Sequence, residues 1–140
     1  MSELRYPTLG EAIRVNKRFT GLAVRDVGLL DSALSRPKAA AFGHEAYPDL
    51  WSKAAALLHS VIRNHPFLEE NKRTATTLAL NLLRMNGVDM ANLDTEAMLS
   101  IAVATANTDI DVAQLAVALR VAVERIEPFD PRRHLPSQQR

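Results

Sequence analysis

Apolar residues recur at three- and four-residue spacings along most of the chain, which is the pattern of helices with one buried face. The two-residue alternation that is typical of strands is missing from the sequence. The spacing therefore predicts six helices, over residues 8–19, 26–35, 49–64, 71–85, 94–106 and 111–126.

Several of these helices begin at residues that cap free amide groups. Thr8 and Glu11 form a capping box, in which each side chain accepts a hydrogen bond at the start of the first helix. Asp94 and Asp111 lead the last two helices, and Gly87 supplies a left-handed stop after the fourth. These signals favour an all-α protein.

The rest of the chain divides into a core domain and connecting segments. Residues 38–48 have no clear periodicity and are expected to form a loop or flap. The helix over 71–85 is apolar around most of its circumference, which predicts a place at the centre of the domain. We expect one compact bundle of about six helices over 1–126 and a flexible C-terminal tail over 127–140, which holds three prolines.

Composition narrows the function classes. The 140 residues are 47% hydrophobic and 24% charged, as in an ordinary globular domain. The net charge of +1 gives no reason to expect direct nucleic-acid binding or a membrane partner, and the lack of cysteine excludes thiol catalysis and disulfides. The first residues contain no apolar segment of the kind that a signal peptide has, and no apolar run reaches roughly 18 to 20 residues, so we expect a cytoplasmic protein without a signal peptide.

One segment, between the third and fourth helices, carries candidate chemistry. The fourth helix begins inside it, so its first amide groups and its dipole form an anion site. Lys72 and Arg73 lie in the first helical turn, where the dipole disfavours cations, but a bound polyphosphate would favour them. The segment reads His65-Pro66-Phe67-Leu68-Glu69-Glu70-Asn71-Lys72-Arg73-Thr74-Ala75.

Other side chains of this segment complement an anion site. The imidazole of His65 is suited to take a proton from a hydroxyl group. Glu69 offers an oxygen ligand for Mg²⁺, and Asn71 can either donate to phosphate or hold the loop through backbone bonds. Phe67 is expected to pin the loop into the core. Together these parts are what phosphoryl or nucleotidyl transfer needs, whereas the alternative is a capping histidine beside ordinary surface charges.

The segment resembles the motif His-x-Phe-x-Asp/Glu-x-Asn-Lys-Arg-Thr-Ala of the Doc (death-on-curing) proteins in the Fic superfamily. The similarity extends over roughly residues 5–126, including Asp26 to Pro37 and Tyr47 to Leu50. It implies a Fic/Doc-type helical fold, in which residues 38–48 form a flap that aligns the target by strand-like pairing. It assigns roles as follows: the catalytic base is His65, the Mg²⁺ ligand is Glu69, and the phosphate of the nucleotide is bound by Asn71, Lys72 and Arg73.

The resemblance also implies an activity and partners. Doc proteins are toxins that transfer the terminal phosphate of Mg²⁺-ATP to a protein hydroxyl, with translation elongation factor Tu as the known target type, and so inhibit translation. Each is paired with an antitoxin whose disordered segment folds on the toxin. AMP-transferring Fic proteins have glycine where Lys72 stands and arginine where Thr76 stands, so this sequence favours phosphate transfer over AMP transfer.

Glu70 departs from the glycine or alanine that the family usually has in this part of the nucleotide-binding segment. The turn at Glu70 could be ordinary, with its side chain pointing away from the nucleotide. Its charge could instead weaken the phosphate site, which would leave a slow enzyme or a binding module. It could also favour the helix N-terminus through the dipole.

Overall fold

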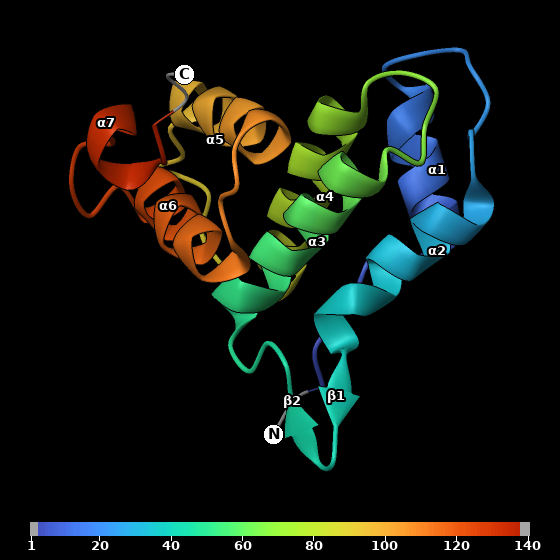
Figure 1. Ribbon diagram of the computed structural model, residues 1–140, viewed down its shortest axis with the longest axis horizontal. Coiled ribbons are helices and arrows are strands. Elements are labelled where there is room, and N and C mark those ends of the chain that lie inside the picture. The colour runs from blue at the N-terminus through green and yellow to red at the C-terminus, as the bar shows by residue number, and fades with distance from the viewer. Residues whose placement is uncertain (1–2, 138–140) are drawn as a thin grey trace.

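The computed structural model describes residues 3–137, and these form an all-α domain, as predicted, together with one small hairpin (Figure 1). The described part holds seven α-helices, a short 3₁₀ helix and two short strands. Their bounds are α1 Leu9–Lys17, α2 Val27–Ser35, η1 Arg36–Lys38, β1 Ala40–Ala41, β2 His44–Glu45, α3 Leu50–Asn64, α4 Asn71–Met85, α5 Thr95–Asn107, α6 Val112–Glu124 and α7 Pro131–His134.

Capping side chains explain where five of the helices begin. The side-chain oxygens of Thr8, Asp26, Asp49, Asp94 and Asp111 each accept a hydrogen bond from the backbone amide three residues later. These bonds are 2.8 to 3.1 Å long, the ordinary range for N–H to oxygen. They satisfy amides that a helix start leaves unpaired, so each predicted start lies within one residue of the observed one.

The central helix is α3, not α4 as the sequence pattern predicted. It packs against α2, α4, α5 and α6, and most of its residues are buried. One face of α4 is polar or exposed, because Lys72, Arg73 and Arg84 lie on it. Over residues 3–137, none of the helices combines the length and apolarity needed to cross a bilayer.

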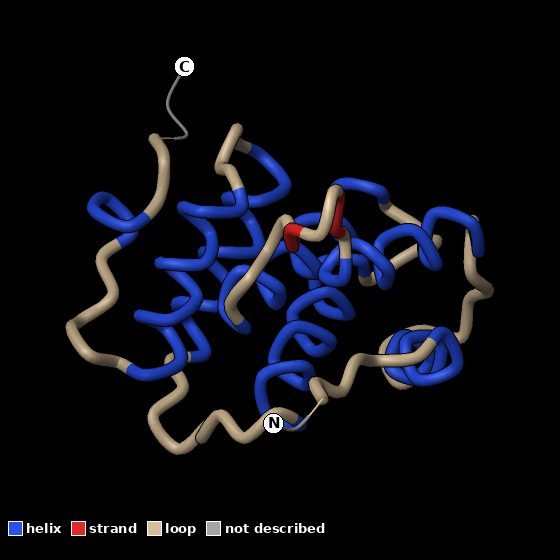
Figure 2. The backbone as a smooth tube through the Cα atoms, turned by 90° about the horizontal axis from the view of Figure 1, so that it is seen from below, coloured by secondary structure: helices blue, strands red, loops and turns tan. Residues whose placement is uncertain are grey.

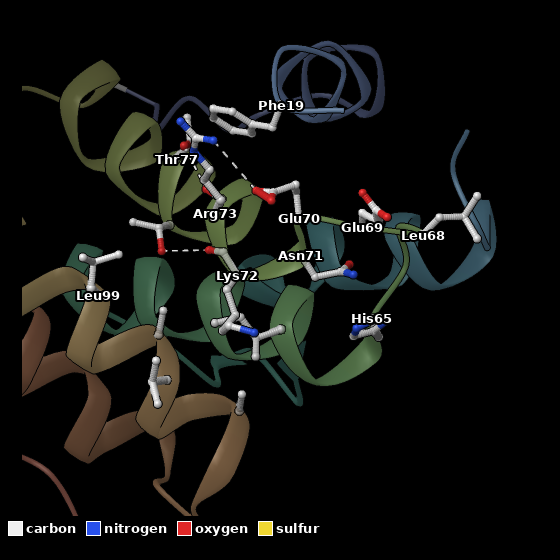
Figure 3. Close-up of a pocket in the computed structure, with 15 residues that line it drawn as sticks. Phe19, His65, Leu68, Glu69, Glu70, Asn71, Lys72, Arg73, Thr77 and Leu99 are labelled. Carbon is white, nitrogen blue, oxygen red and sulfur yellow. Dashed lines mark hydrogen bonds and ion pairs between the residues drawn. The ribbon is translucent and has the colours of Figure 1, made fainter. Parts of the chain in front are cut away.

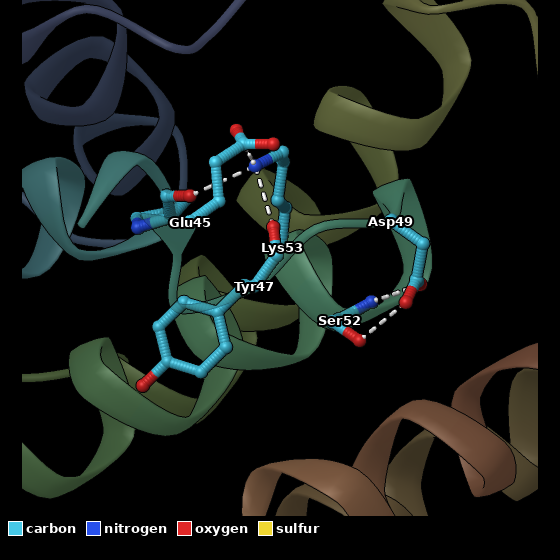
Figure 4. Close-up of polar contacts among 6 residues, drawn as sticks. Glu45, Tyr47, Asp49, Ser52 and Lys53 are labelled. Atoms are coloured by element: carbon cyan, nitrogen blue, oxygen red, sulfur yellow. Dashed lines mark hydrogen bonds and ion pairs between the residues drawn. The ribbon is translucent and has the colours of Figure 1, made fainter. Parts of the chain in front are cut away.

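The segment predicted as a loop or flap contains the two strands of a hairpin, drawn as the red pieces in Figure 2. The strands pair antiparallel, with Ala40 opposite Glu45 and Ala41 opposite His44. The hairpin is anchored by Lys53 of α3, whose side chain is buried. Its Nζ donates to Glu45 Oε1 at 2.8 Å and to the Tyr47 carbonyl at 2.5 Å (Figure 4).

The hairpin lies at the N-terminal end of α3, whereas His65 follows the C-terminal end (Figure 1). The 15 residues of α3 rise by roughly 22 Å between the two ends. This position does not fit the expected role of residues 38–48 in aligning a target segment beside His65. The segment that runs beside the His65 loop is instead the α1–α2 connection, where Val24 forms a bridge with Phe67.

The expectation of a flexible tail over 127–140 does not describe residues 127–137. Leu135 is only 8% exposed and joins the core, and the His134 ring stacks on Phe129 with centroids 5.1 Å apart. Helix α7 therefore packs on α6. Residues 138–140 lie outside the described part of the chain.

Candidate active site

The site is built on the connector between α3 and α4, residues 65–70 (Figure 3). Both ends of the connector have left-handed backbone, with φ of 53° at His65 and 65° at Glu70. Between them, the Phe67 side chain is fully buried, which confirms its predicted role as the anchor of the loop in the core. The side chains of His65, Leu68 and Glu69 remain exposed.

Arg25, in the α1–α2 connection, holds the first part of the connector. Its Nε donates to the His65 carbonyl at 2.7 Å, and its Nη2 donates to the Asn64 carbonyl at 3.0 Å. The backbone amides of Arg25 and Asp26 both donate to the Pro66 carbonyl, at 2.9 and 3.0 Å. Three consecutive carbonyl groups at the end of α3 are therefore bound by this one segment.

Two asparagines hold the rest of the connector. Asn71 accepts from the Phe67 amide and donates to the Phe67 carbonyl, both at 2.9 Å. Asn16 of α1, which is 2% exposed, donates to the Glu69 carbonyl and to Thr74 Oγ1, both at 3.0 Å. Of the two roles considered for Asn71, the structure shows the loop-holding one. Its contact with phosphate stays a prediction, and the bond to the Phe67 carbonyl uses one of its two amide hydrogens.

Sequence reasoning missed both Arg25 and Asn16. A signal existed for Asn16, because it shares a helix face with the buried residues Ala12 and Val15, where an unpaired amide would be costly. No comparable signal existed for Arg25, whose bonds reach about 40 positions along the chain.

We expect Asn16→Leu to lower the free energy of unfolding by about 1–3 kcal/mol, because it leaves the Glu69 carbonyl and the Thr74 hydroxyl without their donor. Urea denaturation measures this change, and hydrogen exchange should become faster at residues 69–71. The exposed neighbour Lys17 is the control, since Lys17→Ala should change stability by no more than about 0.5 kcal/mol. Equal urea midpoints for Asn16→Leu and the wild type would contradict the assigned role.

The N-terminus of α4 faces the connector without a capping side chain. Intrahelical bonding starts with the Thr74 amide, which donates to the Glu70 carbonyl at 2.9 Å. The amides of Asn71, Lys72 and Arg73 precede that bond, and the side chain of the N-cap residue Glu70 accepts none of them. Every other α-helix in residues 3–137 has a side chain that caps its first turn. Unpaired amides and the positive end of the dipole together attract an anion.

Arg73 and Glu70 lie beside each other at this helix start (Figure 3). The Arg73 guanidinium lies 4.2 Å from the centre of the Phe19 ring, and its Nη1 is 4.0 Å from Glu70 Oε2. The positive φ of Glu70 shows that its turn is not an ordinary one, so that interpretation is wrong. The carboxylate is therefore next to a side chain that we expect to bind phosphate.

Glu70→Gly should raise both stability and ATP affinity. Glycine removes the left-handed strain of a side chain at φ 65°, worth roughly 1 kcal/mol, although it adds entropy to the unfolded chain. Loss of the carboxylate releases Arg73, and an exposed ion pair of about 0.2–1 kcal/mol corresponds to a roughly 1.5- to 5-fold gain in affinity. Isothermal titration with ATP measures the gain.

Two further variants separate the two effects of Glu70. Glu70→Gln keeps the strain and removes the charge, and Glu70→Asn removes the charge while tolerating the left-handed backbone better. We expect both to gain affinity and only Glu70→Asn to gain stability. Unchanged ATP affinity in all three variants would show that the carboxylate does not affect the site.

A cavity of about 490 Å³ lies over the connector and the first turn of α4. Its opposite wall comes from α5, where Leu99 and Val103 are 69% and 38% exposed and lie beside Ala102 and Ala106. This apolar wall was not predicted from the sequence. The predicted site residues all line the same cavity, and they are His65, Glu69, Glu70, Asn71, Lys72 and Arg73.

The oxygen ligands in the cavity fit a magnesium ion that takes most of its ligands from a bound nucleotide and water. Within residues 3–137, no three histidine, aspartate or glutamate side chains come together as a metal site. Glu69 contributes one exposed carboxylate to the cavity. Mg²⁺ commonly binds proteins through one or two carboxylates plus phosphate oxygens and water, so Glu69 would hold it together with phosphate.

The helical fold and this connector define a protein of the Fic/DOC family. The sequence model of that family matches residues 6–83, more than half of the chain, and the chain belongs to this family. It is similar to proteins named Doc. It is 49% identical over 100 residues to "Toxin Doc" of Mycolicibacterium smegmatis, covering 68% of this chain and 77% of the relative. It is 34% identical over 104 residues to "Protein kinase doc" of Escherichia phage P1, covering 74% and 80%.

Proposed function

We propose that this chain is a Doc-type toxin that transfers the terminal phosphate of Mg²⁺-ATP to a hydroxyl group of another protein. The observation that carries the proposal is the shared cavity wall. The uncapped N-terminus of α4, with Lys72 and Arg73, lines this cavity. The exposed imidazole of His65 and the exposed carboxylate of Glu69 line the same cavity from the connector. These are an anion cradle, a base and a metal ligand in one place.

In the proposed reaction, the imidazole of His65 takes the proton from the acceptor hydroxyl. The hydroxyl oxygen then bonds to the terminal phosphorus, the bond from that phosphorus to its bridging oxygen breaks, and ADP leaves. The first amides of α4 with Lys72 and Arg73 hold the phosphate oxygens, while the apolar wall of α5 suits the flat base of the nucleotide. Mg²⁺ held by Glu69 would neutralise phosphate charge.

Lys72 supports phosphate transfer over AMP transfer. Its side chain lines the cavity at the helix start, where a glycine would let phosphate approach the backbone more closely. Thr76 also lines the cavity, at the position where AMP-transferring Fic proteins have arginine. The relative from phage P1 is named a protein kinase, which agrees with this choice.

The proposal extends to partners. The relative named Toxin Doc supports pairing with an antitoxin, and we propose that a disordered antitoxin segment folds on this chain. The proposed protein substrate is elongation factor Tu, and the proposed place of action is the cytoplasm. We expect a reading frame of antitoxin size directly upstream. Co-expression of the protein that it encodes should abolish growth inhibition by this chain, and the two proteins should co-purify.

Parallel incubations with γ-labelled and α-labelled ATP, Mg²⁺ and purified elongation factor Tu test the proposal. Label on the factor from γ-labelled ATP alone is the expected result. Label from α-labelled ATP would replace it with AMP transfer. The His65→Asn variant is the negative control in both arms.

The contact of Glu70 with Arg73 favours one second candidate, a binding module with little or no activity. The transfer proposal fails if neither γ-labelled nor α-labelled ATP labels elongation factor Tu or any other protein in a cell extract, and if the Glu70→Gly variant is inactive in the same assays. Binding without transfer would then be the better account of this chain.

A further inference from the structure

His65 has a backbone conformation that its neighbours in the sequence do not favour. A residue before proline is pushed towards extended backbone, yet His65, before Pro66, has φ 53° and ψ 54°. Left-handed backbone also costs roughly 1–2 kcal/mol for a residue with a side chain. The His65 amide donates to the Val61 carbonyl at 3.2 Å, as in a left-handed helix cap, and bonds from outside the connector can reinforce this conformation against the preference of Pro66.

The side chain of Arg25 is placed to supply such bonds. Its planar guanidinium donates through Nε to the His65 carbonyl at 2.7 Å and through Nη2 to the Asn64 carbonyl at 3.0 Å. Carbonyls in the last turn of a helix lack intrahelical partners and carry partial negative charge. A fork of two parallel donors fits two adjacent carbonyls, and the compact ammonium of lysine cannot reproduce this geometry.

We propose that Arg25 is a positioning residue for His65: it fixes the backbone at the end of α3 so that the imidazole faces the cavity. This inference rests on the proposed transfer reaction, in which His65 is the base. Arg25 does not line the cavity, so it acts through His65 and not on the nucleotide. Without the guanidinium, the residue before Pro66 can relax towards extended backbone, and its side chain then changes direction.

The kinetic arm of the test compares Arg25→Ala, Arg25→Lys and the control Arg18→Ala. Arg18 is an exposed arginine at the end of α1, and its substitution removes the same charge as the substitution of Arg25. We expect Arg25→Ala to lower kcat for phosphate transfer by about 10- to 100-fold with less than about twofold change in KM for ATP, because misplacement by about 1 Å has this scale of effect. Arg25→Lys should restore only part of the rate, and Arg18→Ala should match the wild type.

A second arm does not depend on activity. In ¹⁵N-labelled protein without nucleotide, Arg25→Ala should shift the His65 amide and imidazole resonances and speed hydrogen exchange at residues 65–67, whereas Arg18→Ala should not. If a folded Arg25→Ala variant leaves these resonances and kcat at wild-type values, the inference is overturned. If the wild type transfers no phosphate, the proposed function fails, and the resonances alone still decide whether Arg25 positions His65.

Discussion

Replacing His65 by asparagine is expected to lower the rate of phosphate transfer by about 10²–10⁴-fold, the usual contribution of a general base. Asparagine is a better substitution than alanine for this test, because it tolerates the left-handed backbone at this position. The loss therefore reports the missing imidazole and not a rearranged connector. Single-turnover assays with γ-labelled ATP measure the rate.

The stability of the His65→Asn variant should remain within about 0.5 kcal/mol of the wild type, because the imidazole is exposed. ATP binding should also persist, since the proposed phosphate contacts come from α4. A folded variant that binds ATP and still transfers phosphate at the wild-type rate would show that another group takes the proton.

Phe67→Ala is expected to lower the free energy of unfolding by about 3–5 kcal/mol, as for other fully buried aromatic residues. The ring is 0% exposed, and it is the anchor of the connector in the core. Its backbone also exchanges two hydrogen bonds with Asn71, so loosening at Phe67 would spread to the start of α4. Urea denaturation followed by circular dichroism measures the loss.

The next residue offers a matched control for Phe67. Leu68 has an apolar side chain of comparable character but is 48% exposed, so Leu68→Ala should cost about 1 kcal/mol or less. If Phe67→Ala destabilises the protein no more than Leu68→Ala does, the connector is not anchored by this ring.

The helices were predictable because their start signals are local. Asp94 and Asp111 act within three residues, and the side chains of both accept the amide bonds that their positions suggested. Helix ends were less accurate, as in α6, which stops at Glu124 although its apolar pattern continues to Ile126. The spacing of apolar residues predicts which face of a helix is buried, but it does not predict the residue at which the helix ends.

The sequence predicted the side chains that line the candidate site, but not the residues that hold its backbone in place. His65, Glu69 and Lys72 lie within eight residues of one another, so a motif can hold them all. Arg25 and Asn16 reach the same connector from distant positions, and only the packing of α1 and α2 brings them there. The same limit applies to residues 38–48, which the resemblance assigned to a flap that aligns the target and whose hairpin lies at the opposite end of α3 from His65 (Figure 1).

The bonds that hold the connector from outside end on its main chain and not on its reactive side chains. Arg25 binds a carbonyl at His65, and Asn16 binds a carbonyl at Glu69. Substitution of the exposed side chains of His65 and Glu69 therefore leaves these two bonds in place, because both end on backbone atoms. The reactive groups of this loop can thus be varied one at a time on an unchanged backbone.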